Sequence, residues 1–255
     1  MQKNIQKDNL HVEIFPTRSQ MGLAAAQDIE AAICRIIAEK GTCNIIFAAA
    51  PSQNEVLAAL AASSKIDWKN VHAFHMDEYV GISRDAPQGF ANFLRRALFD
   101  RVPLGEVDYL DCTAVPEEEA RRYADLLKKY PADLVVMGIG ENGHIAFNDP
   151  HVADFQDPLA VKVVTLDEKC RLQQVHDGCF ASLSDVPQQA MTLTIPTLCA
   201  PSRVFCIVPA ATKAPAVQAT LEGPVSEKCP ASILRRHPNA TLYLDSDSSS
   251  LLNLG

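Results

Sequence analysis

The sequence predicts a single α/β domain that spans residues 1–255, and three observations carry this prediction. Short apolar runs alternate with stretches of helical periodicity along the chain. One run, DLVVM at Asp133–Met137, is apolar enough for a strand that is buried on both faces. No internal repeat and no linker rich in Pro, Gly or Ser divides the chain. Strands that alternate with helices favour βαβ units, so we expect a Rossmann-like open, mainly parallel sheet flanked by helices on both faces.

The first elements follow from apolar spacing. Gln20–Lys40 repeats Leu and Ile on one helical face and predicts a helix. NIIFA at Asn44–Ala48 is a short β-type run, and the Ala- and Leu-rich stretch Gln53–Ser63 predicts the next helix. Val71–Met76 is again typical of a strand. The chain therefore begins as a helix–strand–helix–strand succession, with a ligand expected at the carboxyl ends of the strands.

The later elements continue this alternation. Pro87–Arg101 places Phe and Leu at helical spacing, with Pro near its start. Pro116–Lys129 opens with Pro and three Glu, which suit the positive end of a helix dipole. Residues 245–250 are polar and are expected to form a fraying tail. The remaining expected elements are a helix at Ala210–Leu221 and strands at Val161–Leu166, Thr192–Pro196, Val204–Val208 and Thr241–Leu244.

The composition excludes several function classes. The chain has 31 Asp and Glu against 23 Lys and Arg, a formal net charge of -8, and scattered basic doublets, so we expect no nucleic-acid partner. No apolar run approaches the roughly 20 residues that cross a bilayer, so we expect no membrane partner. The first twenty residues lack the apolar core of a signal peptide, and the eight cysteines form no CxxC motif. These features favour reduced thiols in a cytoplasmic protein.

Small and polar residues follow the first central strand, in the segment AAAPSQNE at 48–55. Small side chains let a ligand approach the backbone, and a helix N-terminus offers free N–H groups, which together suit a phosphate. Ser52 adds a hydroxyl donor. The same pattern suits an N-cap, with Glu55 closing a capping box. Both interpretations stay open, because a capping hydroxyl can also face a ligand.

Two adjacent acids, Asp77 and Glu78, follow the strand that is expected to end at Met76. Burying carboxylates next to an apolar run costs free energy, so they are expected to be exposed or to have a function. Asp77 is placed to act as a general base. A plain turn is the alternative. In extended chain His75 and Asp77 share a face, but no third ligand has suitable spacing, so we expect no metal.

A glycine-rich segment, GIGENGHIAFNDP at 138–150, follows the strand DLVVM. Its glycines match GxGxxG, but Asn-Asp-Pro ends the next stretch before it reaches the length of the helix that a dinucleotide site needs. We therefore interpret the segment as a loop that wraps around a small ligand, with His144 at its centre. Histidine exchanges protons near neutral pH, and Asp149 is close enough in sequence to orient the imidazole.

These segments together resemble the glucosamine-6-phosphate deaminase (isomerase) family, most closely at MDEYVG (76–81) and GHIAFNDP (143–150). Related 6-phosphogluconolactonases carry a GHTASLF-like stretch in place of the second segment. The order of elements is similar from about residue 10 to residue 245. The resemblance implies that glucosamine 6-phosphate, or a close epimer such as galactosamine 6-phosphate, reacts with water to give a ketose 6-phosphate and ammonia, without a cofactor.

The resemblance also implies roles for individual residues. His144 would assist opening of the pyranose ring, Asp149 would orient His144, and Asp77 would move a proton from C2 to C1 through an enolamine. Lys213 matches the family's phosphate lysine. The residues expected to bind substrate or phosphate are Ser52, Gln53, Gly140, Gly143 and Lys213.

Several positions depart from the family pattern. The phosphate loop reads AAAPSQN instead of a PTGGTP-like sequence, and ENGH replaces NDGH. Asn142 thus stands at a catalytic aspartate position, where it can hydrogen-bond a sugar hydroxyl but cannot take a proton. The family's phosphate arginine would fall near His176, and Arg171 is close enough in sequence to substitute for it. No allosteric residues can be matched in 152–158.

Two other functions stay open. A 6-phosphogluconolactonase-type hydrolase would use His144 to activate water, and a weakened sugar-phosphate sensor would fit the loss of the loop aspartate. The expected partner is a small amino-sugar phosphate, and a homo-oligomer is left open. Because the net charge is negative, the phosphate must be held by local groups rather than by the overall field.

Overall fold

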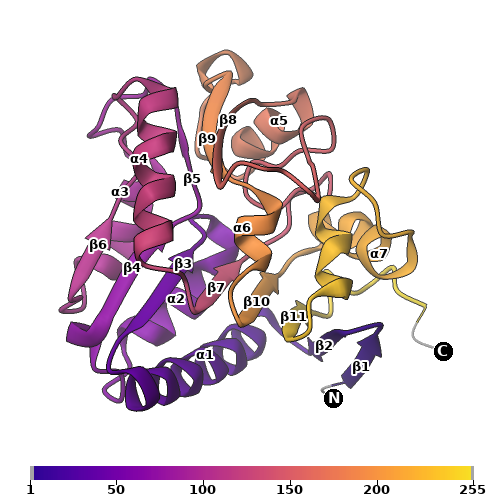
Figure 1. Ribbon diagram of the computed structural model, residues 1–255. Helices are drawn as coiled ribbons and strands as arrows, with labels where there is room; N and C mark the ends of the chain where they lie inside the picture. Colours follow the sequence, from indigo (N-terminus) through magenta and orange to yellow (C-terminus); the bar gives the residue numbers. More distant parts are fainter. Residues whose placement is uncertain (1–2, 254–255) are drawn as a thin grey trace.

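The computed structural model describes residues 3–253 as two sheets, a main sheet of eight strands and a small sheet of three (Figure 1). In the main sheet seven strands run parallel, and only the edge strand β1 is antiparallel to its neighbour. The predicted α/β class, with an open and mainly parallel sheet, is confirmed. The main-sheet strands, in spatial order, are β1 (Lys3–Lys7), β2 (Leu10–Phe15), β11 (Ala240–Asp245), β10 (Arg203–Val208), β7 (Leu134–Met137), β3 (Cys43–Phe47), β4 (Val71–His75) and β6 (Glu106–Asp108).

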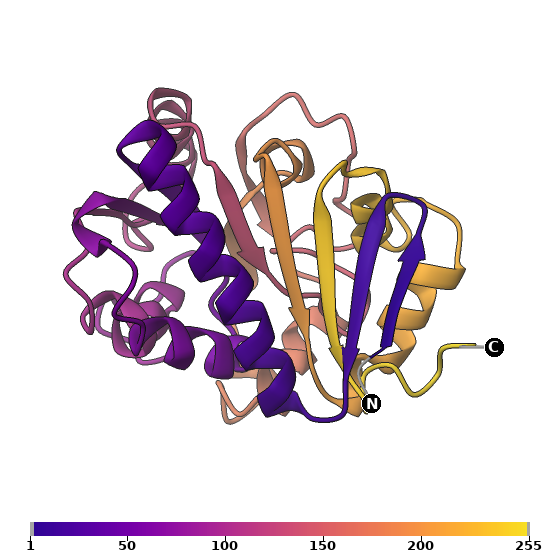
Figure 2. The ribbon, with the colours of Figure 1, turned by 90° about the horizontal axis from the view of Figure 1, so that it is seen from below.

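Helices cover both faces of the main sheet, as predicted (Figures 1 and 2). One apolar cluster lies between the sheet and one group of helices, and a second cluster lies beneath the other group. The first group consists of α1 (Arg18–Lys40), α2 (Asn54–Ala61), α3 (Phe90–Leu94) with the π-helical turn that follows it (Arg95–Phe99), and α5 (Glu168–His176). The second group consists of α4 (Pro116–Lys129), α6 (Ile195–Cys199) and α7 (Ala214–Glu222).

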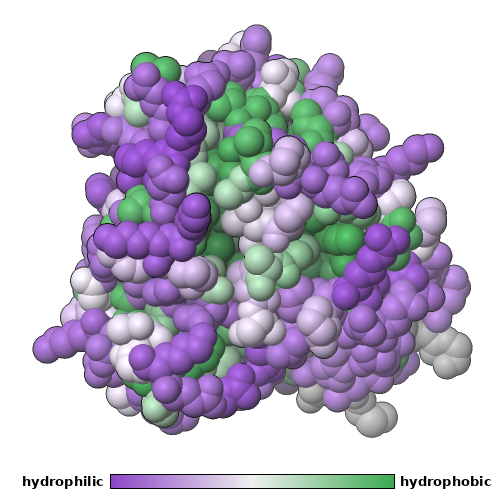
Figure 3. All heavy atoms as spheres, in the orientation of Figure 1, coloured by the Kyte–Doolittle hydropathy of each residue, from purple (hydrophilic) through white to green (hydrophobic). Residues whose placement is uncertain are grey.

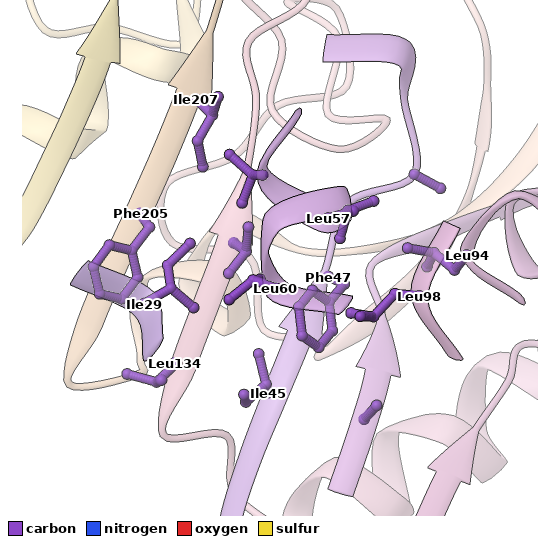
Figure 4. Packing of buried hydrophobic residues seen from close by; sticks show 14 of the residues in the cluster. Ile29, Ile45, Phe47, Leu57, Leu60, Leu94, Leu98, Leu134, Phe205 and Ile207 are labelled. Carbon is purple, nitrogen blue, oxygen red and sulfur yellow. The ribbon is translucent and has the colours of Figure 1, made fainter. Parts of the chain in front are cut away.

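The first apolar cluster joins helices to strands that are distant in sequence (Figure 4). Ile29 of α1 lies beside Phe205 of β10, Leu60 of α2 lies near Phe47 of β3, and Ile45 of β3 belongs to the same cluster. All five side chains are at most 1% exposed. At about 1.5–3 kcal/mol for each large side chain buried, this cluster stabilises the attachment of the first group of helices to the sheet.

The small sheet holds the main departure from the sequence prediction. β5 (Asp77–Tyr79), β9 (Gln189–Leu193) and β8 (Val161–Thr165) form a separate antiparallel sheet in the order β5-β9-β8. The strand expected at Thr192–Pro196 is wrong in its second half, since Ile195 begins α6 with proline in its first turn. Proline lacks an amide hydrogen and suits a helix start better than a ladder.

Smaller differences lie elsewhere in the chain. The β1–β2 hairpin was not predicted, although Leu10, Val12 and Ile14 alternate with more exposed residues in the period of a strand. α5 was also missed, and its mixed polar sequence offers little helical periodicity. The polar residues after Asp245 do not fray, because Ser248 and Ser249 are buried and hydrogen-bonded to Asp245.

The strand order reverses between β7 and β3. From β3 the chain proceeds to β4 and β6 on one side, and then returns to β7, β10 and β11 on the other. Crossovers that leave in opposite directions open a crevice at the carboxyl ends of the two central strands. A ligand is therefore expected above β3 and β7.

Most of the surface that Figure 3 shows is hydrophilic. In the view of Figure 3, hydrophilic side chains dominate, and hydrophobic ones gather in the middle of the face, between α4 and α7. Among residues 3–253, no helix combines the length and the apolar character that a membrane crossing requires.

Candidate active site

A pocket lies at the reversal of the strand order and is lined by four strand ends. Residues 48–52 follow β3, Met76 and Asp77 follow β4, residues 138–140 follow β7, and residues 209–213 follow β10. The three segments singled out from the sequence therefore meet in one place. The rest of the lining comes from Arg18, Phe90, three residues of the loop after β7 and three residues around the end of α5, namely His144, Ala146, Phe147, Gln173, Gln174 and Asp177.

Asp77 lines this pocket at the end of β4. The backbone bends at Met76, so β4 ends at His75 and Asp77 begins β5 in the small sheet. His75 and Asp77 therefore belong to different sheets: His75 ends β4, is fully buried, and accepts a hydrogen bond at Nε2 from the Leu110 amide at 2.9 Å. The Asp77 carboxylate is 7% exposed and makes no hydrogen bond to any residue in 3–253. Burial, and secondarily the charge of Glu78, raises its pKa well above the usual value.

Glu78 points away from Asp77 and holds the start of α3. Its carboxylate accepts hydrogen bonds from the amides of Tyr79, Phe90 and Ala91 at 2.9–3.0 Å. A carboxylate at a helix N-terminus satisfies free N–H groups and the positive end of the dipole. Burial nevertheless raises the pKa of Glu78 to about 7. Glu78 thereby fixes Phe90, which lines the pocket.

His144 lines the pocket and is held from behind by two residues of its own loop. Its Nδ1 lies 2.7 Å from Asn142 Oδ1 and 3.1 Å from Asp149 Oδ1. Both partners are acceptors, so Nδ1 carries the hydrogen and Nε2 is left for a ligand. Burial alone would raise the pKa of Asp149, but hydrogen bonds from His144, Asn142 and the Asp167 amide, together with the charge of His144, lower it.

Asn142 lies behind the histidine and does not line the pocket. Its Nδ2 donates to Asp149 Oδ1 at 2.9 Å and to Asp167 Oδ2 at 3.1 Å, while its Oδ1 faces His144. Both ends of the amide are engaged within the protein, so its observed contacts hold the loop and the histidine, and contact with a sugar hydroxyl stays a prediction. An aspartate here would place a third carboxylate against Asp149 and Asp167, so the amide suits its surroundings.

The glycines of the loop have separate tasks. A Cβ on Gly140 would occupy the space of the His144 imidazole, so glycine makes room for the ring. Gly143 has φ 86°, in the left-handed region that glycine adopts most readily, and packs against Cys229. Of the two, only Gly140 lines the pocket. The structure thus places Gly143 as a support of the loop and not as a ligand.

The other end of the pocket is suited to an anion. Ser52 and Lys213 both line it. Lys213 is 6% exposed, and its ammonium has no hydrogen bond or ion pair in the described part of the chain. Burial lowers its pKa, although the charges of Asp177 and Glu141 oppose this shift. A buried ammonium without a partner is costly, and an anionic ligand would remove that cost.

Gln53 is a positioning residue. Its side chain is fully buried, and its Nε2 donates to Ser52 Oγ at 3.0 Å and to the Ile207 carbonyl at 3.2 Å. It therefore ties the loop after β3 to the end of β10. Its side chain does not line the pocket, so substrate binding by Gln53 stays a prediction while its observed contacts are structural.

Neither candidate for the phosphate arginine reaches the pocket. Arg171 donates to the carbonyls of Leu183 and Val186 at 2.7 and 2.9 Å, which holds α5 to the next loop. His176 is exposed and lies 3.6 Å from Glu141. The cation that sequence reasoning missed is Arg18, which lines the pocket from the start of α1.

The backbone beside Lys213 is strained. Ala210 has φ 80° and ψ 148°, a region that is almost restricted to glycine, and its amide donates to the buried Asp245 carboxylate at 3.1–3.2 Å. We expect Ala210→Gly to raise the free energy of unfolding by about 1 kcal/mol, because strain of about 1–3 kcal/mol is relieved at a smaller entropic cost. Denaturant titration measures this change.

A glycine substitution in ordinary helical backbone provides the control for Ala210. Ala219→Gly, at an exposed position of α7, should instead lower the free energy of unfolding by about 1 kcal/mol. If both substitutions lowered it equally, the strain at Ala210 would be refuted.

The described residues also contain groups of metal-ligating type. The ligand atoms of His144, Asp149 and Cys170 lie within 4.8 Å of one another. Burial raises the pKa of the Cys170 thiol well above its usual value, and His144 Nδ1 already faces two hydrogen-bond acceptors. This chemistry fits a hydrogen-bonded cluster better than a metal centre, because metal binding needs the thiolate.

Fold and site together define an α/β protein with a desolvated acid, an oriented histidine and a cationic end in one pocket. The sequence profile described as glucosamine-6-phosphate isomerases/6-phosphogluconolactonase matches residues 16–243. The chain belongs to this family.

Individual relatives agree with the family match. The glucosamine-6-phosphate deaminase of Exiguobacterium sibiricum is 36% identical over 192 residues, which are 74% of this chain and 73% of the relative. That of Listeria monocytogenes is 34% identical over 213 residues, or 83% and 89% of the two chains. A solved monomeric glucosamine-6-phosphate deaminase has TM-score 0.86 at 28% identity and covers 94% of this chain and 99% of its own. The 6-phosphogluconolactonase of Trypanosoma brucei shares the fold, with TM-score 0.79 at 17% identity over 99% and 100% of the two chains.

Proposed function

We propose that the protein converts glucosamine 6-phosphate and water to fructose 6-phosphate and ammonia. The observation that carries this proposal is the pairing in one pocket of His144 with Asp77, a desolvated carboxylate that has no hydrogen-bond partner among residues 3–253. The names of the relatives support it. The reaction is an isomerisation coupled to deamination, so the broader term hydrolase describes only its last, water-consuming step.

The arrangement suits the first step, ring opening. His144 Nε2 faces the pocket while Asn142 and Asp149 hold Nδ1, so Nε2 can take the proton of the C1 hydroxyl and then give a proton to the ring oxygen. The negative charge of Asp149 stabilises the imidazolium form between these transfers. The product of this step is the open-chain amino aldose.

The second step is proton transfer between neighbouring carbons. Asp77 takes the C2 proton, the ammonium group on C2 gives a proton to the C1 carbonyl oxygen, and the product is an enolamine with a hydroxyl on C1. Return of the proton to C1 gives an iminium at C2, which water hydrolyses to the ketone and ammonia. A carboxylate whose pKa is raised by burial is a stronger base than one in water, which suits this task.

An assay for both products tests the proposal. Purified protein supplied with glucosamine 6-phosphate should release ammonia and fructose 6-phosphate in equal amounts. Galactosamine 6-phosphate and 6-phosphogluconolactone belong in the same panel. Turnover of the lactone alone would assign a hydrolase instead, and tight binding of an amino-sugar phosphate without product would assign a sensor.

We expect Lys213→Met to raise KM for the sugar phosphate about 10- to 100-fold, since a charged hydrogen bond contributes about 1.5–3 kcal/mol. The variant should also unfold at higher temperature, because it removes a buried ammonium that has no partner among residues 3–253. Steady-state kinetics and thermal unfolding measure the two effects. Lys169→Met, at an exposed site on α5, is the control and should change neither. A lower unfolding temperature for Lys213→Met would contradict this account.

A further inference from the structure

Neither His176, which stands near the position of the family's phosphate arginine, nor Arg171, its expected substitute, lines the pocket, whereas Arg18 does. Among the lining residues only Arg18 and Lys213 carry fixed positive charge. Arg18 is the first residue of α1, more than 150 positions from Arg171 in the sequence. Arg18 is therefore the one residue of α1 that lines the pocket, and it brings a guanidinium group to it.

The guanidinium of Arg18 is fixed beside the loop after β3. Its Nε donates to Glu55 Oε1 at 2.7 Å, and its Nη2 donates to the carbonyl of Pro51, the residue before Ser52. Nη1 makes no hydrogen bond to the part of the chain that the structure describes. Two nitrogens thus set the plane of the group, and Nη1 keeps its donors on a residue that lines the same pocket as Ser52.

Close packing of two helices sets this geometry. A Cβ on Gly22 would overlap the Cβ of Glu55, so glycine lets α1 approach α2 at this point. Glu55 is thereby brought within reach of Arg18, one turn earlier on α1. Glu55 is a positioning residue, because it holds Arg18 and does not line the pocket.

Arg18 also breaks a local rule of helix structure. A cation in the first turn of a helix opposes the dipole, and no acid lies in the first turn of α1 to offset it. Residues that violate such local preferences tend to mark functional sites. The capping of α1 by Thr17, whose hydroxyl accepts from the Gln20 amide at 3.2 Å, needs no arginine at the next position.

We propose that Arg18 binds the phosphate group of the substrate together with Lys213 and Ser52, in place of an arginine from the α5 region. This inference rests on the proposed function for the identity of the substrate. Guanidinium groups suit phosphate because their fork of donors matches two of its oxygens. Half-exposure of Arg18 at the pocket rim allows the phosphate to enter while Lys213 meets it from the buried side.

The first test measures binding of inorganic phosphate, which needs no turnover. In a phosphorus NMR titration we expect Arg18→Met to weaken binding about 10- to 100-fold. Arg18→Lys, which keeps the charge but loses the fork, should fall between Arg18→Met and the unaltered protein. Arg35→Met removes an exposed arginine from the same helix and should leave binding unchanged. Thermal unfolding of each variant verifies that it is folded.

The second test uses glucosamine 6-phosphate turnover. Arg18→Met should raise KM by a factor similar to the loss of phosphate affinity, with kcat changed much less. If Arg18 only held α1 to the loop after β3, Arg18→Met would lower kcat as well, because Ser52 and that loop would move. Phosphate binding without ammonia release from the unaltered protein would reject the proposed reaction and leave this inference standing.

The inference itself is overturned by either of two results. One is an Arg18→Met variant that binds phosphate as tightly as the unaltered protein and keeps its KM. The other is an unaltered protein that binds no inorganic phosphate at all.

Discussion

Asp77→Asn is expected to lower kcat for ammonia release about 10²- to 10⁴-fold, the usual contribution of a general base. An amide cannot accept the C2 proton, yet it occupies the same volume as the carboxyl. Because the Asp77 carboxylate makes no hydrogen bond to residues 3–253, the substitution breaks none. KM should therefore change little, and steady-state kinetics with an ammonia assay measures both constants.

The same substitution should stabilise the fold, and the effect should depend on pH. Burial, and then the charge of Glu78, raises the pKa of Asp77 in the folded protein above its unfolded value of about 3.8. The folded state then holds the proton more tightly, so the cost of ionising Asp77 is absent in acid and grows as pH rises through the folded pKa. Asp77→Asn removes that cost, and its gain in free energy of unfolding should be larger at neutral pH than in acid.

Asp125→Asn provides the matched control, because Asp125 is an exposed acid on α4. It should alter neither kcat nor the pH dependence of stability. Full kcat in Asp77→Asn would reject Asp77 as the base. A loss of stability at neutral pH would show that the carboxylate has a partner that the structure lacks.

Much of the fold was predictable because apolar spacing records burial directly. α4 has the predicted bounds, Pro116–Lys129, since its charged first turn and apolar stripe are both encoded locally. The small sheet was not predictable in the same way. The bend at Met76 sends consecutive residues into two sheets, and that choice depends on β9, which lies more than 100 residues later.

The site was predictable where a strand end carries an unusual residue. Asp77, His144 and Lys213 all follow strands of the main sheet, and parallel strands bring their carboxyl ends to one edge. Their contacts were not predictable: Asn142 turned out to engage two acids and a histidine at once. Arg18 was missed because it precedes the first central strand, and its only signal was a cation where a helix dipole disfavours one.

Asp149→Asn is expected to lower kcat about 10²-fold or more. Asp149 holds His144 Nδ1 at 3.1 Å and supplies the negative charge that stabilises the imidazolium. Asn142 Oδ1 also accepts from Nδ1, at 2.7 Å, and should preserve the tautomer when the charge is lost. The loss should therefore be smaller than the roughly 10⁴-fold that follows when a triad histidine takes the wrong tautomer.

A double-mutant cycle separates these two contributions. If Asn142 and Asp149 both hold Nδ1, then Asn142→Ala combined with Asp149→Asn should lower kcat by more than the product of the single effects, because either partner alone preserves the tautomer. If the loss of kcat in the double variant equals the product of the two single losses, Asn142 stabilises the loop and does not hold the His144 imidazole.

Stability against pH gives a second readout, opposite in sign to that of Asp77. Burial works against ionisation of Asp149, but the hydrogen bond and charge of His144, Asn142 Nδ2 and the Asp167 amide outweigh it and lower the pKa. Asp149 therefore contributes stability above its unfolded pKa, and this contribution is lost as pH falls through the folded pKa. Asp149→Asn should destabilise the protein at neutral pH and cost progressively less in acid, whereas Asp77→Asn should stabilise it at neutral pH. A base and an orienting anion in one site require carboxylates whose pKa values are shifted in opposite directions. If the two variants changed the free energy of unfolding at neutral pH in the same direction, this division of roles would be refuted.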